Sequence, residues 1–152
     1  MIKKTILLIG TLLCACSLFA WEWEKEGDTV TILPNEKSTI LNASEDAPWF
    51  NDENEKLKII ISECITEIYD GTIKGSKNIA SVIVGSTVKR IGKEAFANCS
   101  NLEFVDLSES LLSIDDRAFY DCPKLNTLLV PGENTEIGKD ILGSSNYVNE
   151  AL

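Results

Sequence analysis

The sequence repeats itself every 23 residues, and this period strongly limits the folds that the chain can adopt. Ile91, Phe96, Cys99 and Leu102 are followed 23 residues later by Ile114, Phe119, Cys122 and Leu125, without an insertion. The same step defines four units, at residues 59–81, 82–104, 105–127 and 128–150. At the repeat positions of this cysteine and this phenylalanine, the outer two units have other residues, as expected of the terminal units of a stack. The period is typical of a solenoid, in which each unit forms one coil.

The spacing of apolar residues within a unit indicates its local structure. Val105 and Leu107 are two residues apart, which places both side chains on one face of a strand. Phe119, Cys122 and Leu125 are three residues apart, as on one side of a helical or 3₁₀ turn. The inward side chains of each coil can be buried only by the coils above and below. The sequence therefore predicts an α/β solenoid of four coils, with short parallel strands and short helical turns.

Residues 21–58 are predicted to form an N-terminal cap on the repeat domain at 59–150. Two β-prone runs, at 28–33 and 38–41, flank the segment Pro34-Asn35-Glu36-Lys37 and predict a β-hairpin. The pair Trp49-Phe50 is expected to cover the open apolar end of the first coil, because an uncovered end would promote aggregation. A platform for a ligand is the alternative interpretation of this aromatic pair.

Residues 1–20 have the pattern of a secretory signal peptide. A basic start, Met1-Ile2-Lys3-Lys4, precedes an apolar run at 5–13 that is too short for a membrane anchor. Cleavage after Ala20 is favoured, whereas Leu13-Cys14-Ala15-Cys16 resembles a lipobox in which Cys16 would be lipidated. Both interpretations predict an exported protein, either secreted, periplasmic or at the cell surface. No later apolar run is long enough to span a membrane once the signal is removed.

Charge and composition exclude several classes of function. The chain has 14 basic and 24 acidic residues, a net charge of -10, so nucleic-acid binding is not expected. It has no histidine, the usual general base and a common zinc ligand. Cys99 and Cys122 occupy equivalent positions in adjacent coils and are predicted to form a buried structural ladder rather than a metal site. We expect no catalytic residue, no metal site and no cofactor.

The strands carry an unusually apolar outward stripe. Each strand has one outward residue between its inward ones, and these residues are Ile60, Ile83, Asp106 and Leu129. Phe104, just before the third strand, adds an aromatic side chain to the same face. Exposed apolar surface often marks a binding face. The alternative is that the hairpin cap or a second copy of the chain covers part of the stripe.

The segments VKRIGKEAFANCSNLEFVDL and LLSIDDRAFYDCPKLNTLLVP resemble the BspA-like leucine-rich repeats of bacterial surface proteins. The second unit matches that pattern at Ile91, Gly92, Ala95, Phe96, Cys99 and Leu102. The third unit departs from it at Asp115, which stands where the pattern has glycine. The resemblance covers about residues 59–150 and implies a stack of the leucine-rich-repeat type. It also implies adhesion or another surface contact, and it brings no catalytic residues.

Two hypotheses for function follow. The first is an exported, non-enzymatic leucine-rich-repeat protein that binds a protein or another cell-surface macromolecule through its strand face. The second is a structural component of the cell envelope that self-associates through its solenoid ends or strand faces.

Overall fold

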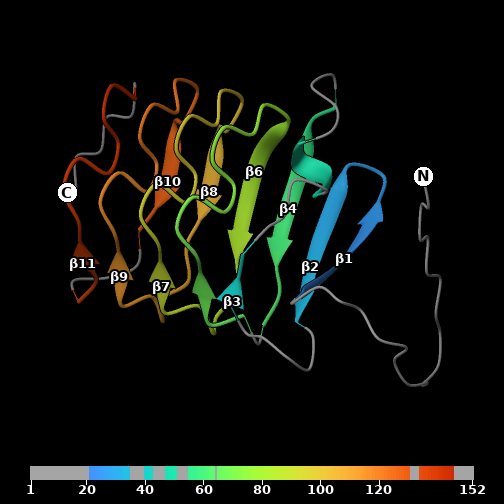
Figure 1. The fold of residues 1–152 in the computed structure, drawn as a ribbon, viewed down its shortest axis with the longest axis horizontal. Helices are drawn as coiled ribbons and strands as arrows, with labels where there is room; N and C mark the ends of the chain where they lie inside the picture. Colours follow the sequence, from blue (N-terminus) through green and yellow to red (C-terminus); the bar gives the residue numbers. More distant parts are fainter. Residues whose placement is uncertain are drawn as a thin grey trace.

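The computed structural model describes residues 21–34, 40–42, 47–50, 55–63, 65–130 and 134–145. Through these residues the chain winds into a β-solenoid of about four turns (Figure 1). The predicted signal segment at 1–20, with Cys16, lies outside the described residues. Within the described part of the chain, no helix is long and apolar enough to cross a membrane.

Two sheets form the walls of the solenoid. The six-stranded sheet consists, in spatial order, of β1 (Trp21–Glu26), β2 (Thr29–Pro34), β4 (Leu57–Ile61), β6 (Ile79–Val84), β8 (Phe104–Asp106) and β10 (Thr127–Leu129). The five-stranded sheet consists of β11 (Glu136–Ile137), β9 (Ser113–Ile114), β7 (Arg90–Ile91), β5 (Glu67–Ile68) and β3 (Ile40–Leu41). Neighbouring strands are parallel in both sheets, except for the antiparallel pair of β1 and β2. The sequence predicted one column of strands; the second sheet was not predicted, because its strands are only two residues long.

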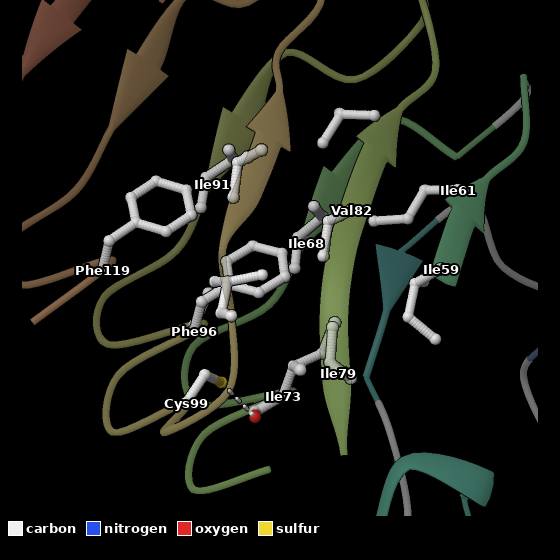
Figure 2. Close-up of a cluster of buried hydrophobic side chains, with 14 of the residues drawn as sticks. Ile59, Ile61, Ile68, Ile73, Ile79, Val82, Ile91, Phe96, Cys99 and Phe119 are labelled. Atoms are coloured by element: carbon white, nitrogen blue, oxygen red, sulfur yellow. Dashed lines mark hydrogen bonds between the residues drawn. The ribbon is translucent and has the colours of Figure 1, made fainter. Parts of the chain in front are cut away.

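The strand register follows the 23-residue period. Val82 lies opposite Val105, which lies opposite Leu128, while Ile91 lies opposite Ile114 in the second sheet. Side chains alternate between buried and half-buried along β4, as expected of a strand with one face on the core. The buried residues form one core between the two sheets, in which aligned side chains of successive coils pack on one another (Figure 2).

The predicted helical turns are wrong. The helix in the described residues is a 3₁₀ turn, η1 (Pro48–Phe50), upstream of the four coils. Glu94 and Asn98 in the second coil, and Arg117 and Asp121 in the third, have φ between 52° and 59°. Left-handed residues at two repeated positions interrupt a helix. The backbone donates to the next coil instead, as in the 2.8 Å bond from Phe96 N to Ala118 O. The three-residue spacing of inward side chains therefore comes from tight turns.

The predicted N-terminal hairpin is also wrong in its pairing. β2 forms a hairpin with the preceding strand β1, around Gly27 and Asp28, rather than with the following run. β2 then pairs in parallel with β4, and β3 pairs with β5 in the other sheet. The two runs thus join the two walls of the solenoid, because their inward residues Val30, Ile32 and Leu41 are buried in the common core.

Of the aromatic pair Trp49-Phe50, one side chain lies in the core and the other lies at the surface. Trp49 is fully buried, and its carbonyl accepts a 2.9 Å hydrogen bond from Ser76 Oγ in the first coil. Trp49 therefore packs in the core beside the first coil. It does not cover an open end there, because β2 and β3 continue both sheets beyond the first coil. Phe50 is 41% exposed.

Asp115, which departs from the family pattern, belongs to an alternation between neighbouring coils. The Asp70 carboxylate accepts the backbone N–H of Lys93 at 3.0 Å, and the Asp116 carboxylate accepts that of Lys139 at 2.7 Å. Each accepting aspartate lies against a glycine of the following coil, Gly92 or Gly138. A carboxylate in the first and third coils thus binds the backbone of the second and fourth. This alternation removes the need for glycine in the third coil.

Candidate functional site

The outward residues of the six-stranded sheet form two adjacent rows. The first, which we call the outer row, contains Thr31, Ile60, Ile83, Asp106 and Leu129, each opposite the next in the strand register. Phe104 lies in the neighbouring row, between Ser81 and Thr127. The five residues named from the sequence as a binding face are therefore gathered on one side of one sheet.

Among the apolar residues of this face, the one on the last strand is the most exposed. Leu129 on the last strand is 50% exposed, whereas Ile60, Ile83 and Phe104 are half-buried. Strands β1 and β2 do not cover the outer row, because they extend the same sheet edge to edge. The described strands of the cap therefore lie beside the stripe and not over it.

The outer surface of the five-stranded sheet is dominated by charge. Arg90 on β7 donates to Glu67 and to Asp70, the latter at 2.9 Å. It also donates to one Asp115 oxygen, through Nε at 3.0 Å and a terminal nitrogen at 2.5 Å. Burial alone would lower the pKa of Arg90, but its hydrogen bonds to Asp115, Asp70 and Glu67 outweigh burial and raise that pKa. This arrangement joins three successive coils by one cation.

Replacing Arg90 with methionine is expected to lower the free energy of unfolding by about 1 kcal/mol, because three carboxylates then face one another without a cation. Added NaCl should recover part of the loss by screening their repulsion. Arg117→Met is the control, since Arg117 makes only an exposed 3.8 Å pair with Asp140 and an exposed contact with the Tyr120 ring, 5.2 Å from its centroid, and its loss should matter less. Urea unfolding at low and high salt measures both effects, and an Arg90→Met loss insensitive to salt would contradict the explanation.

The two cysteines of the ladder are buried, and both are free. Cys99 Sγ donates to the carbonyl of Ile73 at 3.3 Å, and Cys122 Sγ donates to that of Phe96 at 3.2 Å (Figure 2 shows the first bond). Contact with the Cys122 thiol, together with burial, raises the pKa of Cys99 and favours its protonated, donating form. These side chains thus act as hydrogen-bond donors between coils, a role that was not predicted from the sequence.

The serines in the same column explain why the outer coils can do without cysteine. Ser76 Oγ donates to Trp49 O at 2.9 Å, and Ser145 Oγ lies 3.4 Å from Phe119 O. Ser76 therefore makes the same contact to the preceding turn as the cysteines do. Ser145 Oγ donates at 2.5 Å to Leu142 O in its own coil and makes only the longer contact to the preceding coil. The sequence contained a signal for this donor role, because serine replaces cysteine at this repeat position. The two residues share a small size and a hydrogen-bond donor.

Cys122→Ser is accordingly expected to change the free energy of unfolding by less than about 1 kcal/mol. Cys122→Val, which keeps the volume but removes the donor to Phe96, should lower it by about 1–2 kcal/mol. Chemical denaturation of the two variants measures the difference. Equal losses would show that packing alone selects the residue in this column.

An open hollow of about 310 Å³ lies at the C-terminal end of the five-stranded sheet. It is lined by Lys93, Ser113, Ile114, Asp115, Asp116, Glu136, Ile137 and Gly138. Two of its three carboxylates already have partners: Asp115 binds Arg90, and Asp116 accepts the Lys139 N–H. The described residues contain no group of three or more acidic or cysteine side chains placed to hold a metal ion.

The repeat that builds this geometry is shared with a known family. The family model of the BspA type leucine rich repeat region matches residues 46–149, in six copies. The chain belongs to this family. Repeats of this kind typically form protein-interaction scaffolds without catalytic activity. No curated protein matches the sequence.

Several solved structures share the fold of this BspA-type repeat protein. A leucine rich repeat protein of T. pallidum is 18% identical, with a TM-score of 0.57 over 83% of this chain and 54% of that one. A leucine-rich repeat protein from Eubacterium ventriosum is 26% identical, with a TM-score of 0.58 over 79% of this chain and 32% of that one. The pneumococcal vaccine antigen PcpA is 21% identical, with a TM-score of 0.61 over 79% of this chain and 27% of that one. The BspA-type chain thus spans about half or less of these proteins.

Proposed function

We propose that this BspA-type repeat protein is an exported, non-enzymatic module that binds a protein or another cell-surface macromolecule through the outer face of its six-stranded sheet. The observation that carries the proposal is the outer row, in which Ile60, Ile83 and Leu129 share one face with the neighbouring Phe104. Adjacent outward apolar side chains on a sheet with no core on that side often mark a surface that a partner covers.

The family and the proposed export of the chain support an adhesion-type role. The family is one of bacterial leucine-rich repeats, and one similar structure is that of a vaccine antigen. The basic-then-apolar segment at 1–20 supports export. Mass spectrometry of the protein made in a bacterial host tests that step: a chain beginning at Trp21 indicates ordinary cleavage, whereas a lipidated Cys16 indicates an anchored lipoprotein. An uncleaved chain in the cytoplasm would contradict export.

A capture experiment tests the binding face. The processed protein and an Ile83→Asp, Phe104→Asp, Leu129→Asp variant are immobilised and exposed to host-surface and bacterial envelope extracts. We expect a partner that the wild type retains and the triple variant loses. Capture that is equal for both proteins would overturn the proposal.

The matched control carries three aspartates on the other side of the solenoid. Ile40, Tyr69 and Leu112 are 38%, 46% and 59% exposed in or beside the five-stranded sheet, so their substitution adds the same charge to a comparably exposed surface. This control should retain the partner. Circular dichroism and urea unfolding must show that both triple variants are folded.

A second candidate, self-association through the C-terminal end of the stack, is favoured by Ile137. This residue is 41% exposed, whereas Ile114 and Ile91 at the same position in earlier coils are at most 1% exposed. Strands β10 and β11 form the corresponding edges of the two sheets. Sedimentation velocity tests this candidate: an oligomer weakened by Ile137→Asp supports it, and a monomer at all concentrations overturns it.

A further inference from the structure

One acidic residue interrupts the apolar outer row. In the strand register, Asp106 on β8 lies between Ile83 on β6 and Leu129 on β10, with about 5 Å between neighbouring strands. Phe104 lies two residues earlier on the same strand and the same face, about 7 Å away. The half-buried Asp106 carboxylate therefore has apolar neighbours on three sides.

This carboxylate has no counter-ion within the described part of the chain. No hydrogen bond or ion pair joins it to another described residue. Lys58, a basic residue of the same face, lies two strands away in the neighbouring row. Lys56 is paired with Glu103 at 3.2 Å. A carboxylate that loses water beneath a partner needs a compensating charge, and no described residue is placed to supply it.

The remaining charge of this face also favours a cationic partner. Glu24 and Glu26 on β1 lie opposite Thr31 and Thr29 and are exposed, and neither takes part in an ion pair with a described residue. The whole chain carries a net charge of -10. A field of this sign attracts cations over a distance. Close contact would then be most favourable where the apolar surface and an unpaired carboxylate coincide, at Asp106.

We infer that the partner is a protein segment that presents an arginine side chain, flanked by apolar residues, to Asp106. The inference rests on the proposed binding function of this face. A guanidinium group pairs with a carboxylate through two parallel hydrogen bonds, and its plane packs on an aromatic ring such as Phe104. The aliphatic stem of arginine covers apolar neighbours, here Ile83 and Leu129. Lysine matches the charge but neither the planar stacking nor the paired hydrogen bonds.

A phage-displayed library of random dodecapeptides, selected on the processed protein, tests this inference. Selected peptides should be enriched in arginine next to apolar residues. A synthetic copy of a selected peptide should bind about tenfold more tightly than the same peptide with citrulline, which keeps the shape of arginine but is neutral. Asp106→Asn should weaken the arginine peptide by a similar factor and leave the citrulline peptide unchanged.

Glu109→Gln is the matched control, because it makes the same change in net charge at an exposed turn position beyond β8. It should alter binding of the arginine peptide by less than twofold. Peptides that lack arginine but lose binding on Ile83→Asp would overturn the inference and leave the proposed face intact. Peptides whose binding survives the Ile83→Asp, Phe104→Asp, Leu129→Asp variant would overturn both. A selection without arginine-containing binders also overturns the inference.

Discussion

Replacing Phe119 with alanine is expected to lower the free energy of unfolding by about 4 kcal/mol. Phe119 is fully buried and stacks on Phe96 of the preceding coil, with ring centroids 5.1 Å apart and planes 8° from parallel. Figure 2 shows the two rings one above the other in the core. The substitution removes the ring from the middle of the stack, where coils on both sides prevent collapse into the cavity. Urea unfolding followed by circular dichroism measures the loss.

The chain provides its own control for this change. The position 23 residues after Phe119 is Leu142, which packs partly buried against the same core. Phe119→Leu should therefore cost only about 1 kcal/mol, because leucine fits the column and leaves a smaller cavity. If alanine and leucine cost the same, the loss would come from the aromatic stacking itself and not from the cavity.

The repeat made the inward columns and the outward stripe predictable from the sequence. A fixed step of 23 residues assigns every position to a column, so Ile83, Asp106 and Leu129 had to be neighbours once the strand was recognised. The second sheet was not predictable in this way. Its strands are two residues long, too short for alternation to appear in the sequence, and only their position in the stack makes them a sheet.

The turns were mispredicted because spacing alone does not distinguish a helix from a series of tight turns. Glu94 and Arg117 have left-handed backbone conformations although neither is glycine, so the sequence carries no obvious mark of them. The inter-coil hydrogen bonds hold them in that conformation. The glycines at the equivalent position in the first coil and four residues later, Gly71 and Gly75, were the available signal, because both have positive φ.

The proposed binding face was only partly predictable from the sequence, for a different reason. Which side chains point outward follows from the strand pattern, but the pairing of charges does not. The sequence shows Asp106 and Asp115 as two similar acidic residues. In the structure Asp115 is bound by Arg90 from the neighbouring coil, whereas Asp106 has no partner among the described residues. Asp115 is therefore part of an internal ion pair, whereas Asp106 is a candidate contact for a partner.

Gly92→Ala is the second change expected to have a large effect, a loss of about 3 kcal/mol in the free energy of unfolding. A Cβ atom at this position would lie 2.7 Å from Asp70 N and 2.9 Å from Ile68 O, both backbone atoms of the preceding coil. It would also lie 2.4 Å from Asp70 Oδ1, the atom that accepts the Lys93 N–H. The coils must separate to admit the methyl group, which weakens the 2.8 Å bond from Gly92 N to Ile68 O.

Gly71→Ala separates this steric effect from the backbone preference of glycine. Gly71 has a φ of 66°, yet a Cβ there would meet no atom within 4 Å. Gly71→Ala should therefore lower the free energy of unfolding only by the cost of placing alanine in a left-handed conformation, about 1 kcal/mol. Equilibrium unfolding of both variants, with crystal or NMR structures of Gly92→Ala to show the displaced coil, measures the comparison. Equal losses would mean that the close approach of coils at Gly92 is not what requires glycine there, and the alternation of aspartate and glycine would then need another cause.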